Sequence, residues 1–337
     1  MANKRDKKTP EMIARLCEAH FSQKVEKVTA PGGSGRDSMR VHFAERTIIA
    51  TERKYPGRMQ MEAEILRRLS EGGAAVPRYL GEAEGVFFQQ DVGGRRLSGE
   101  LATLGGKARL EIAGRAMASL GNIHEVGQAA GLTDIVPALG SEANWLRGMI
   151  GNVAQVSLRL NIPPPVLDTP ALTAALHVPR ETFLKWDARP GNASIGRDGR
   201  VYWFDWEHSG KRQGMEDFAW LAGDEFWPLG PDQVVDLLEG LLPQHRRASD
   251  VRYLGLFITF HIVQRLGIIR ARFDKSGWAD PERAMRYDRI GVDGDLIRRL
   301  CRHGAEWAMR DPLSRPMADW FVSCAETLNG GWTPAKP

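Results

Sequence analysis

Hydrophobic and polar residues alternate along three short runs between residues 24 and 51: "KVEKVTA", "SMRVHFA" and "RTIIAT". Alternation that is rich in β-branched residues is typical of half-buried strands. Because the stretch "PGGSGRD" and the dipeptide "ER" separate the runs, the pattern predicts three antiparallel strands. A further hairpin is predicted where "RYLGEAEG" leads into "VFFQQDV".

Two stretches beside these strands have helical spacing. Thr9-Pro10-Glu11 combines a capping residue with a proline suited to the first turn, and Met12, Ile13 and Leu16 follow. The second helix is predicted over residues 57–73, where one face is apolar and paired glycines end the pattern. The apolar residues of that face are Met59, Met61, Ile65, Leu66 and Leu69.

Helical spacing dominates after the glycines of "DVGGRRL". We therefore expect an α+β chain with a small antiparallel-sheet lobe (residues 1–92) and a larger, mainly helical lobe (residues 93–337). The helices begin with residues 106–127 and continue with "EANWLRGMIGNVAQVSLRL", whereas the prolines of "NIPPPVLDTP" predict a loop. Short strands are expected around "FLKWDARPGNASI" and "VYWF".

Composition narrows the class of protein. The chain has 337 residues, 42% of them hydrophobic and 26% charged, which is typical of globular proteins and long enough for two lobes that share a cleft. The apolar run "YLGLFITFHIVQRLGII" is interrupted by His261, Gln264 and Arg265, so we expect a buried helix and no membrane association. The basic N-terminus lacks the apolar segment of a secretory signal, which predicts a cytoplasmic protein.

Charge and cysteine content exclude further classes. The net charge is +4 with scattered Lys and Arg, so a nucleic-acid partner is not expected. Cys17, Cys301 and Cys324 lack metal-binding spacing and are predicted to be core residues. His124 and His208 have no partner histidines at ligand spacing, and the tryptophans near residues 203–227 are also predicted to lie in the core.

Three polar residues stand out in apolar surroundings. Asp187 and Asn192 lie at the two ends of the turn "DARPGN", and Asp205 follows the strand "VYWF". Two carboxylates and an amide oxygen are hard ligands suited to Mg²⁺, which bridges nucleotide phosphates. A carboxylate that is not needed by the metal can orient and deprotonate an attacking hydroxyl, as in kinases. Either aspartate alone would more simply be a turn or cap residue.

The turn "PGGSGRD" offers a second clue. Its Gly32, Gly33 and Ser34 are predicted to let backbone amides approach a phosphate closely, although hairpins often contain glycines for conformational reasons alone.

These motifs together resemble those of the aminoglycoside phosphotransferase and choline kinase superfamily, which has a protein-kinase-like fold. The family's H-G-D-x-x-P-G-N loop is similar to "KWDARPGN", its I-D-W-E strand end to "FDWE", and its Y-D-L-A helix start to "EDFA". "LGNIH", "VPRYLG" and "GGRRL" are similar to further landmarks, so the resemblance spans about residues 25–222. It implies that Asp187 is the catalytic base, that Asn192 and Asp205 hold Mg²⁺, and that ATP or GTP binds the segment containing Gln90 and Val92.

The chain departs from the family pattern at three places. Lys185 replaces the usual histidine, Trp186 replaces a glycine, and the strand "TIIATERK" lacks the lysine that contacts the phosphates. Arg53 or Lys54 could serve instead, paired with the helix glutamate Glu62. Arg53 is preferred because, if the strand continues that far, its side chain lies on the same face as those of Ile49 and Thr51.

Spacing suggests two further roles near the base. Arg189, two residues after Asp187, is expected to reach the transferring γ-phosphate. Asp217 is expected to cap a helix and to hydrogen-bond the loop that carries the base.

The prediction is an ATP- or GTP-dependent, Mg²⁺-dependent kinase of a small-molecule hydroxyl. Arginine-rich late helices favour a neutral or anionic acceptor over a polycationic antibiotic. Asp187, Glu207, Asp224 and Glu225 are candidate acceptor contacts, although Asp224 and Glu225 are more simply surface residues. A catalytically weak or dead nucleotide-binding regulator remains an alternative, as does a protein kinase, against which the short "DWE" to "EDFAW" interval weighs.

Overall fold

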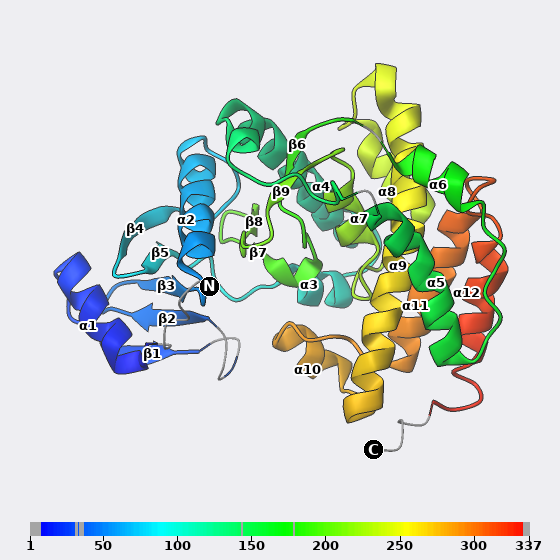
Figure 1. Cartoon of the computed structure of the whole chain (residues 1–337). Helices are drawn as coiled ribbons and strands as arrows, with labels where there is room; N and C mark the ends of the chain where they lie inside the picture. The colour runs from blue at the N-terminus through cyan, green and yellow to red at the C-terminus, as the bar shows by residue number, and fades with distance from the viewer. Residues whose placement is uncertain (1–7, 31–32, 34–36, 143, 178, 333–337) are drawn as a thin grey trace.

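The predicted antiparallel sheet is present at the N-terminal end of the chain (Figure 1). The computed structural model describes residues 8–30, 33, 37–142, 144–177 and 179–332. The sheet has five strands in the order β1-β2-β3-β5-β4, all paired antiparallel. Its strands are β1 (Lys27–Thr29), β2 (Ser38–His42), β3 (Thr47–Glu52), β4 (Tyr79–Ala83) and β5 (Val86–Gln90).

A helix covers each face of this sheet: α1 (Pro10–Phe21) and α2 (Pro56–Glu71). Successive side chains of a strand point to opposite faces. Phe88 of β5 therefore packs in the cluster that contains α1, while Phe87 joins the cluster that contains α2. Burial from both sides explains why β5 is buried continuously from Val86 to Gln89 rather than at alternate positions.

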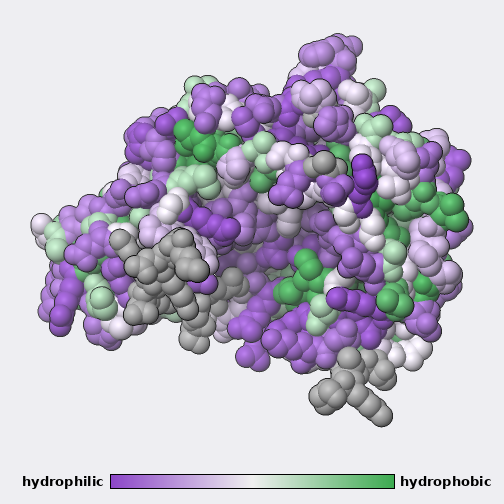
Figure 2. All heavy atoms as spheres, viewed as in Figure 1, coloured by the Kyte–Doolittle hydropathy of each residue, from purple (hydrophilic) through white to green (hydrophobic). Residues whose placement is uncertain are grey.

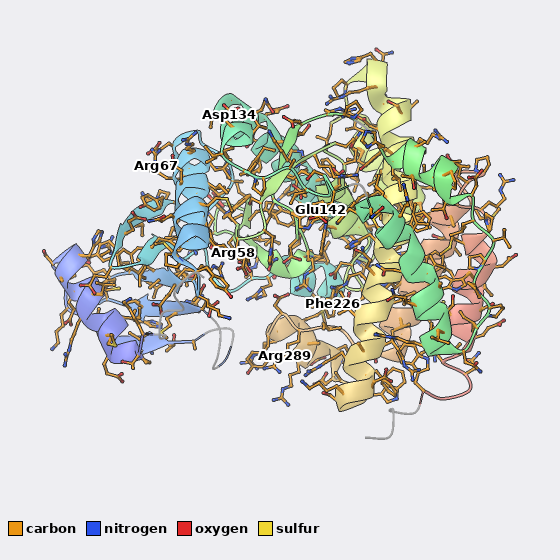
Figure 3. All side chains as sticks on the ribbon, in the orientation of Figure 1. Arg58, Arg67, Asp134, Glu142, Phe226 and Arg289 are labelled. Carbon is orange, nitrogen blue, oxygen red and sulfur yellow. The ribbon has the colours of Figure 1, made fainter. Side chains whose placement is uncertain are left out.

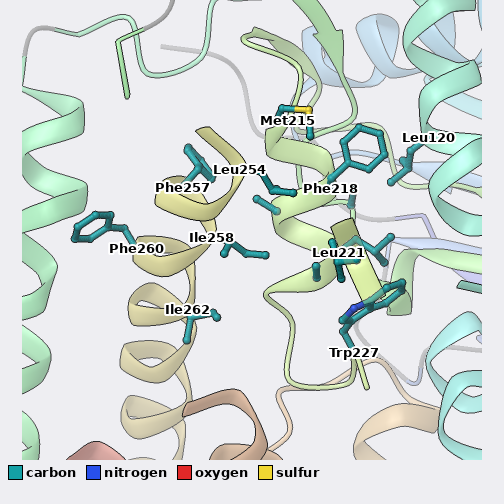
Figure 4. Packing of buried hydrophobic residues seen from close by; sticks show 14 of the residues in the cluster. Leu120, Met215, Phe218, Leu221, Trp227, Leu254, Phe257, Ile258, Phe260 and Ile262 are labelled. Carbon is teal, nitrogen blue, oxygen red and sulfur yellow. The ribbon is translucent and has the colours of Figure 1, made fainter. Parts of the chain in front are cut away.

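The helical lobe begins at α3 and confirms the predicted α+β class. Its central element is α9 (Arg247–Ser276), which is apolar around most of its surface, as expected of a buried helix. In Figure 4, Leu254 and Ile258 of α9 point toward α7, where Phe218 and Leu221 face them. The other helices are α3 (Leu97–Thr103), α4 (Gly106–Ala129), α5 (Trp145–Leu160), α6 (Thr169–Leu176), α7 (Glu216–Ala222), α8 (Pro231–Glu239), α10 (Pro281–Arg286), α11 (Gly294–Ala308) and α12 (Met317–Glu326).

One segment of the described chain, Gln244–Ser276, is long and apolar enough to cross a membrane by length and composition. Its most apolar window is 72% buried inside the fold, as in the core helix of a globular protein. The three cysteines are also buried, as predicted.

The proline-rich stretch before α6 is shorter than predicted. Asp168 caps the helix through a 3.0 Å hydrogen bond from the Ala171 amide, and Pro170 occupies the first turn. The sequence interpretation treated residues 161–170 as non-helical and missed this start, because proline is tolerated in the first helical turn.

Four short strands form two small antiparallel pairs beside α4: β6 with β9, and β7 with β8. The segment between β6 and β7 carries the "WDARPGN" motif, and the segment after β8 carries "FDWE". Pairing of these strands thus brings the two motifs together. The strands are β6 (Thr182–Leu184), β7 (Ala193–Ile195), β8 (Val201–Trp203) and β9 (Gly210–Arg212).

Candidate active site

Residues 187–192, which we call the 187–192 turn, bring the predicted polar groups together. Asn192 Nδ2 donates hydrogen bonds to Asp187 Oδ2 at 2.8 Å and to the Asp187 carbonyl at 3.0 Å. The Phe204 amide donates to the Asn192 carbonyl at 3.1 Å, so Asp205 follows directly after a contact with this turn. Lys185 Nζ donates to the Asp205 carbonyl at 2.7 Å.

The backbone at this junction is in the left-handed region. Trp186, Asp187 and Asp205 have φ values of 52°, 48° and 68°. Such conformations cost about 1–3 kcal/mol each and persist only where the surroundings enforce them. The family glycine that Trp186 replaces would adopt this conformation without a β-carbon clash.

Asp217 of α7 enforces the conformation. Its carboxylate accepts hydrogen bonds from the amides of Lys185 at 2.8 Å and Trp186 at 2.7 Å. His124 of α4 lies 2.8 Å from the same carboxylate, which is fully buried. The expected hydrogen bond between Asp217 and this loop is thus present, but Asp217 does not cap α7, whose N-cap residue is Met215.

Lys185 takes the place of the histidine in the related motif. Its side chain is fully buried, and its ammonium group lies 5.3 Å from the centre of the Trp206 ring. Burial lowers the pKa of Lys185, although the nearby Asp205 and Asp187 oppose that shift. Its hydrogen bond to the Asp205 carbonyl links the two motif segments.

Arg53, directly after β3, forms a paired contact with Glu62 of α2. Its Nε and Nη2 atoms lie 2.6 and 2.8 Å from the two carboxylate oxygens. Nη2 also lies 2.5 Å from Asp205 Oδ1, and Nη1 lies 3.6 Å from Glu207. Burial alone would lower the pKa of Arg53, but these acids, Glu62 foremost, raise it.

The pair with Glu62 is the one predicted for Arg53, whereas Lys54 is exposed.

Burial alone would raise the pKa of the Asp205 carboxyl, but Arg53 and then Lys185 lower it. Asp205 is therefore held as a carboxylate at the junction of the two lobes.

The surface between the lobes is hollowed and lined mainly by hydrophilic residues (Figure 2). Arg58 of α2 and Arg289, which follows α10, come from different lobes and lie near this hollow (Figure 3). Helix α10 packs against α3 on the same side. A polar groove between a sheet and a helical lobe suits a charged ligand better than an apolar one.

The predicted nucleotide contacts are only partly described. Gly32 and Ser34 lie outside the described residues, and Gly33 has a φ of 89° with its amide bonded to the Ala30 carbonyl at 3.0 Å. The Gln90 amide donates to the Arg78 carbonyl at 2.9 Å, so this N–H is already used. Val92 is half-buried and has no backbone hydrogen bond to another described residue.

The prediction that Asp224 and Glu225 are surface residues is wrong. They were expected at the surface, but they are 2% and 1% exposed. Arg265 of α9 binds Glu225 through contacts of 2.7–3.0 Å and lies 3.7 Å from Asp224. The sequence showed Arg265 within the apolar run of α9, but it did not show that this buried cation faces and compensates the acidic pair.

Two residues at the turn were missed from the sequence. Arg96, just before α3, donates to the Gly191 carbonyl, and its guanidinium lies 5.7 Å from the centre of the Phe204 ring. Asp288, after α10, accepts a hydrogen bond from Arg189 at 2.6 Å. Arg96 belongs to the "GGRRL" landmark, but that motif gave no sign that its side chain reaches the turn. Asp288 lies in no recognised motif and is 99 residues from Arg189, so no local signal identified it.

Comparison with known proteins agrees with this arrangement. A family model described as the phosphotransferase enzyme family matches residues 30–251. None of the curated proteins matches the chain significantly.

Solved structures of phosphotransferases have a similar fold. An aminoglycoside 2'-phosphotransferase in complex with GDP has a TM-score of 0.55 at 14% identity, covering 88% of this chain and 99% of that one. A spectinomycin phosphotransferase with ADP and spectinomycin has a TM-score of 0.54 at 13% identity, covering 94% and 100%. A macrolide 2'-phosphotransferase from Brachybacterium faecium has a TM-score of 0.52 at 12% identity, covering 81% and 96%. The match of the family model over most of the chain is decisive: this protein belongs to the phosphotransferase enzyme family.

Proposed function

We propose that the protein is a Mg²⁺-dependent kinase that transfers the γ-phosphoryl group of ATP or GTP to a hydroxyl of a small molecule. The observation that carries the proposal is the 187–192 turn, where Asn192 fixes the Asp187 carboxylate beside the segment that presents Asp205. Family membership supports the reaction class.

In the proposed reaction Asp187 is the base. The acceptor hydroxyl gives its proton to the Asp187 carboxylate as its oxygen forms a bond to the γ-phosphorus, while the bond to the bridging oxygen breaks and nucleoside diphosphate leaves. Positioning and electrostatic stabilisation supply most of the rate in this reaction class. Arg189, whose Nε lies 3.3 Å from Asp187 Oδ1, is placed to stabilise the transferring group.

The donor set suits Mg²⁺. Asn192 uses its amide nitrogen on Asp187, which leaves its oxygen without a hydrogen bond from any described residue. Asp205 uses Oδ1 on Arg53, and Oδ2 has no described partner. Mg²⁺ typically takes one or two protein oxygens and completes its octahedral shell with phosphate and water. Bound there, the metal would neutralise phosphate charge.

The nucleotide would lie between the sheet and the 187–192 turn. Arg53 reaches Asp205 from β3 and is the group proposed to contact the phosphates. The segment from Gln90 to Val92, between the lobes, is proposed to bind the base. The GDP and ADP in the related structures support a purine nucleotide.

The acceptor is proposed to be neutral or anionic. A polycation would need exposed acidic groups around the base. Asp224 and Glu225 do not supply that charge, because both are buried and face Arg265.

The test combines nucleotide binding with turnover. We expect MgATP or MgGTP to raise the melting temperature, and a library of hydroxyl compounds to include one that stimulates nucleotide consumption. Asp187→Asn should lower kcat by about 10²-fold or more while nucleotide stabilisation persists. Asp198→Asn is the matched control, since Asp198 is exposed on the turn between β7 and β8. Full turnover by Asp187→Asn would refute the assigned base.

One observation favours a second candidate, a nucleotide-binding regulator without transfer. Arg53 replaces the expected lysine and already occupies one oxygen of Asp205 at 2.5 Å. The same experiment separates the two functions, because a regulator would be stabilised by nucleotide without consuming it.

A further inference from the structure

The segment after α10 places a carboxylate on the 187–192 turn. Asp288 Oδ1 accepts a hydrogen bond from Arg189 Nη2 at 2.6 Å, and the two side chains are only 12% and 14% exposed. The same carboxylate packs against the backbone of Gly191, where a β-carbon would overlap it. Asp288 thus contacts both a side chain and the main chain of the turn that carries Asp187.

The core fixes the position of Asp288. Its own φ is 47°, a conformation that Asp tolerates better than most residues. The next residue, Arg289, donates its amide to the Ala284 carbonyl at 2.8 Å. Two residues later the Gly291 amide donates to the buried Glu225 carboxylate at 2.9 Å. The residues directly after Asp288 are therefore held both to α10 and to the buried Glu225 carboxylate, which fixes the chain beside the turn.

Arg189 lies between two carboxylates. Its Nη2 binds Asp288, while its Nε lies 3.3 Å from Asp187 Oδ1 without forming a hydrogen bond. Guanidinium groups favour paired contacts with a single carboxylate. Without Asp288, Arg189 could turn fully onto Asp187, whose other oxygen is already used by Asn192. Both oxygens of the base would then be engaged.

Charge supports this division of roles. Burial alone would lower the pKa of Arg189, but Asp288, followed by Asp224 and Asp187, raises it. Asp288 is thus the strongest of the acids that keep this guanidinium charged.

We propose that Asp288 is a positioning residue for phosphoryl transfer: it holds Arg189 toward the transferring group and leaves an oxygen of Asp187 open to the acceptor hydroxyl. The inference rests on the proposed kinase function. Asp288 lies beyond residues 30–251, so this chain supplies the carboxylate from outside the part matched by the family model.

The test is a double-mutant cycle on Asp288 and Arg189. Wild type, Asp288→Asn, Arg189→Met and the double variant are assayed for MgATP and MgGTP consumption, with water and with any stimulating hydroxyl compound. We expect Asp288→Asn to lower kcat about tenfold or more with the nucleotide KM changed by less than about twofold, because transfer and not nucleotide binding is affected. The double variant should be no slower than Arg189→Met, since Asp288 acts through Arg189.

Asp280→Asn is the matched control, because Asp280 caps the same α10 segment through the Glu282 amide and Asn caps equally well. Urea unfolding of the four proteins of the cycle tests the contact independently of turnover, and coupling between the two positions is expected.

Three results would overturn the inference. The first is an active wild type with unchanged kcat in Asp288→Asn. The second is fully additive losses in the double variant, or no coupling in the unfolding cycle. The third is a wild type that consumes no nucleotide under any condition, which defeats the proposed function itself and is recognised because it appears before any substitution.

Discussion

Replacing Arg53 with Met tests the link between the two lobes. The change removes the guanidinium that binds Glu62 through two contacts and Asp205 through a third. Met keeps much of the aliphatic volume, so the main loss is electrostatic. Glu62, which is 1% exposed, then becomes a buried charge without its cation.

The expected loss follows from that burial. Removing one partner of a buried ion pair costs about 3–5 kcal/mol, because the other charge stays uncompensated. Burial raises the pKa of Glu62, so this group can take up a proton instead, and it keeps the hydrogen bond from the Trp206 amide at 3.1 Å. We therefore expect the lower end of the range, about 3 kcal/mol at neutral pH. The loss in the free energy of unfolding should become smaller as pH falls, because protonation of Glu62 removes its buried negative charge.

Urea unfolding followed by tryptophan fluorescence measures this loss. Arg67→Met on the same helix is the matched control, because Arg67 and its partners Glu64 and Glu71 are 39%, 33% and 62% exposed. Such a surface pair contributes about 0–1 kcal/mol. In Arg53→Met/Glu62→Leu, an apolar pair replaces the ionic one, and about half of the loss should be recovered.

Two outcomes would refute the reasoning. Arg53→Met could be no less stable than Arg67→Met, which would mean that Glu62 is not left as an uncompensated charge. The double variant could also be as unstable as Arg53→Met, which would place the loss in Asp205 or in packing rather than in Glu62.

Three further substitutions test a contact to the catalytic loop, a buried acidic residue and a close helix contact. Asp217→Ala removes the acceptor for two loop amides and should lower kcat by about 10²-fold, while the rise in melting temperature on adding nucleotide stays the same. A kcat equal to that of the wild type would contradict this. Burial raises the pKa of Asp224 to about 7, so the contribution of Asp224 to stability should fall as pH rises from about 4 to 7, and Asp224→Asn should remove that contribution in urea titrations at several pH values. Gly127→Ala puts a β-carbon into the Phe183 ring and should cost about 1–3 kcal/mol, whereas Gly121→Ala in the same helix, with open space around it, should add up to about 1 kcal/mol.

Local patterns predicted the sheet lobe and part of the site. Period-two alternation predicted the positions of the strands. It also favoured Arg53 over Lys54 as the residue that points inward, and in the structure Arg53 binds Glu62 while Lys54 is exposed to solvent. The motif placed Asp187 and Asn192 at the two ends of one turn, but the hydrogen bonds from the Asn192 amide to Asp187 were found only in the structure.

Long-range charge compensation was not predictable in this way. Asp224 and Glu225 look like surface acids until Arg265, 40 residues later, is placed beside Glu225 by the packing of α9. Hydrophobic patterns predict which faces of helices and strands are buried. They do not show which buried acidic and basic residues of different elements come into contact. Asp288 is a second example, since its partner lies on a different element.

Trp186 shows how the fold tolerates a departure from the family motif. A tryptophan in the left-handed region is strained, and a glycine there would not be. Its ring packs against Trp145, Trp220 and Phe257 at centroid distances of 5.7–6.3 Å, which stabilises the side chain that causes the strain. Its amide is held by Asp217 whatever the side chain is, because that contact is to the main chain. The turn that presents Asp187 is therefore held through its main-chain amides by the Asp217 carboxylate of α7, a contact that does not depend on which side chain precedes the base.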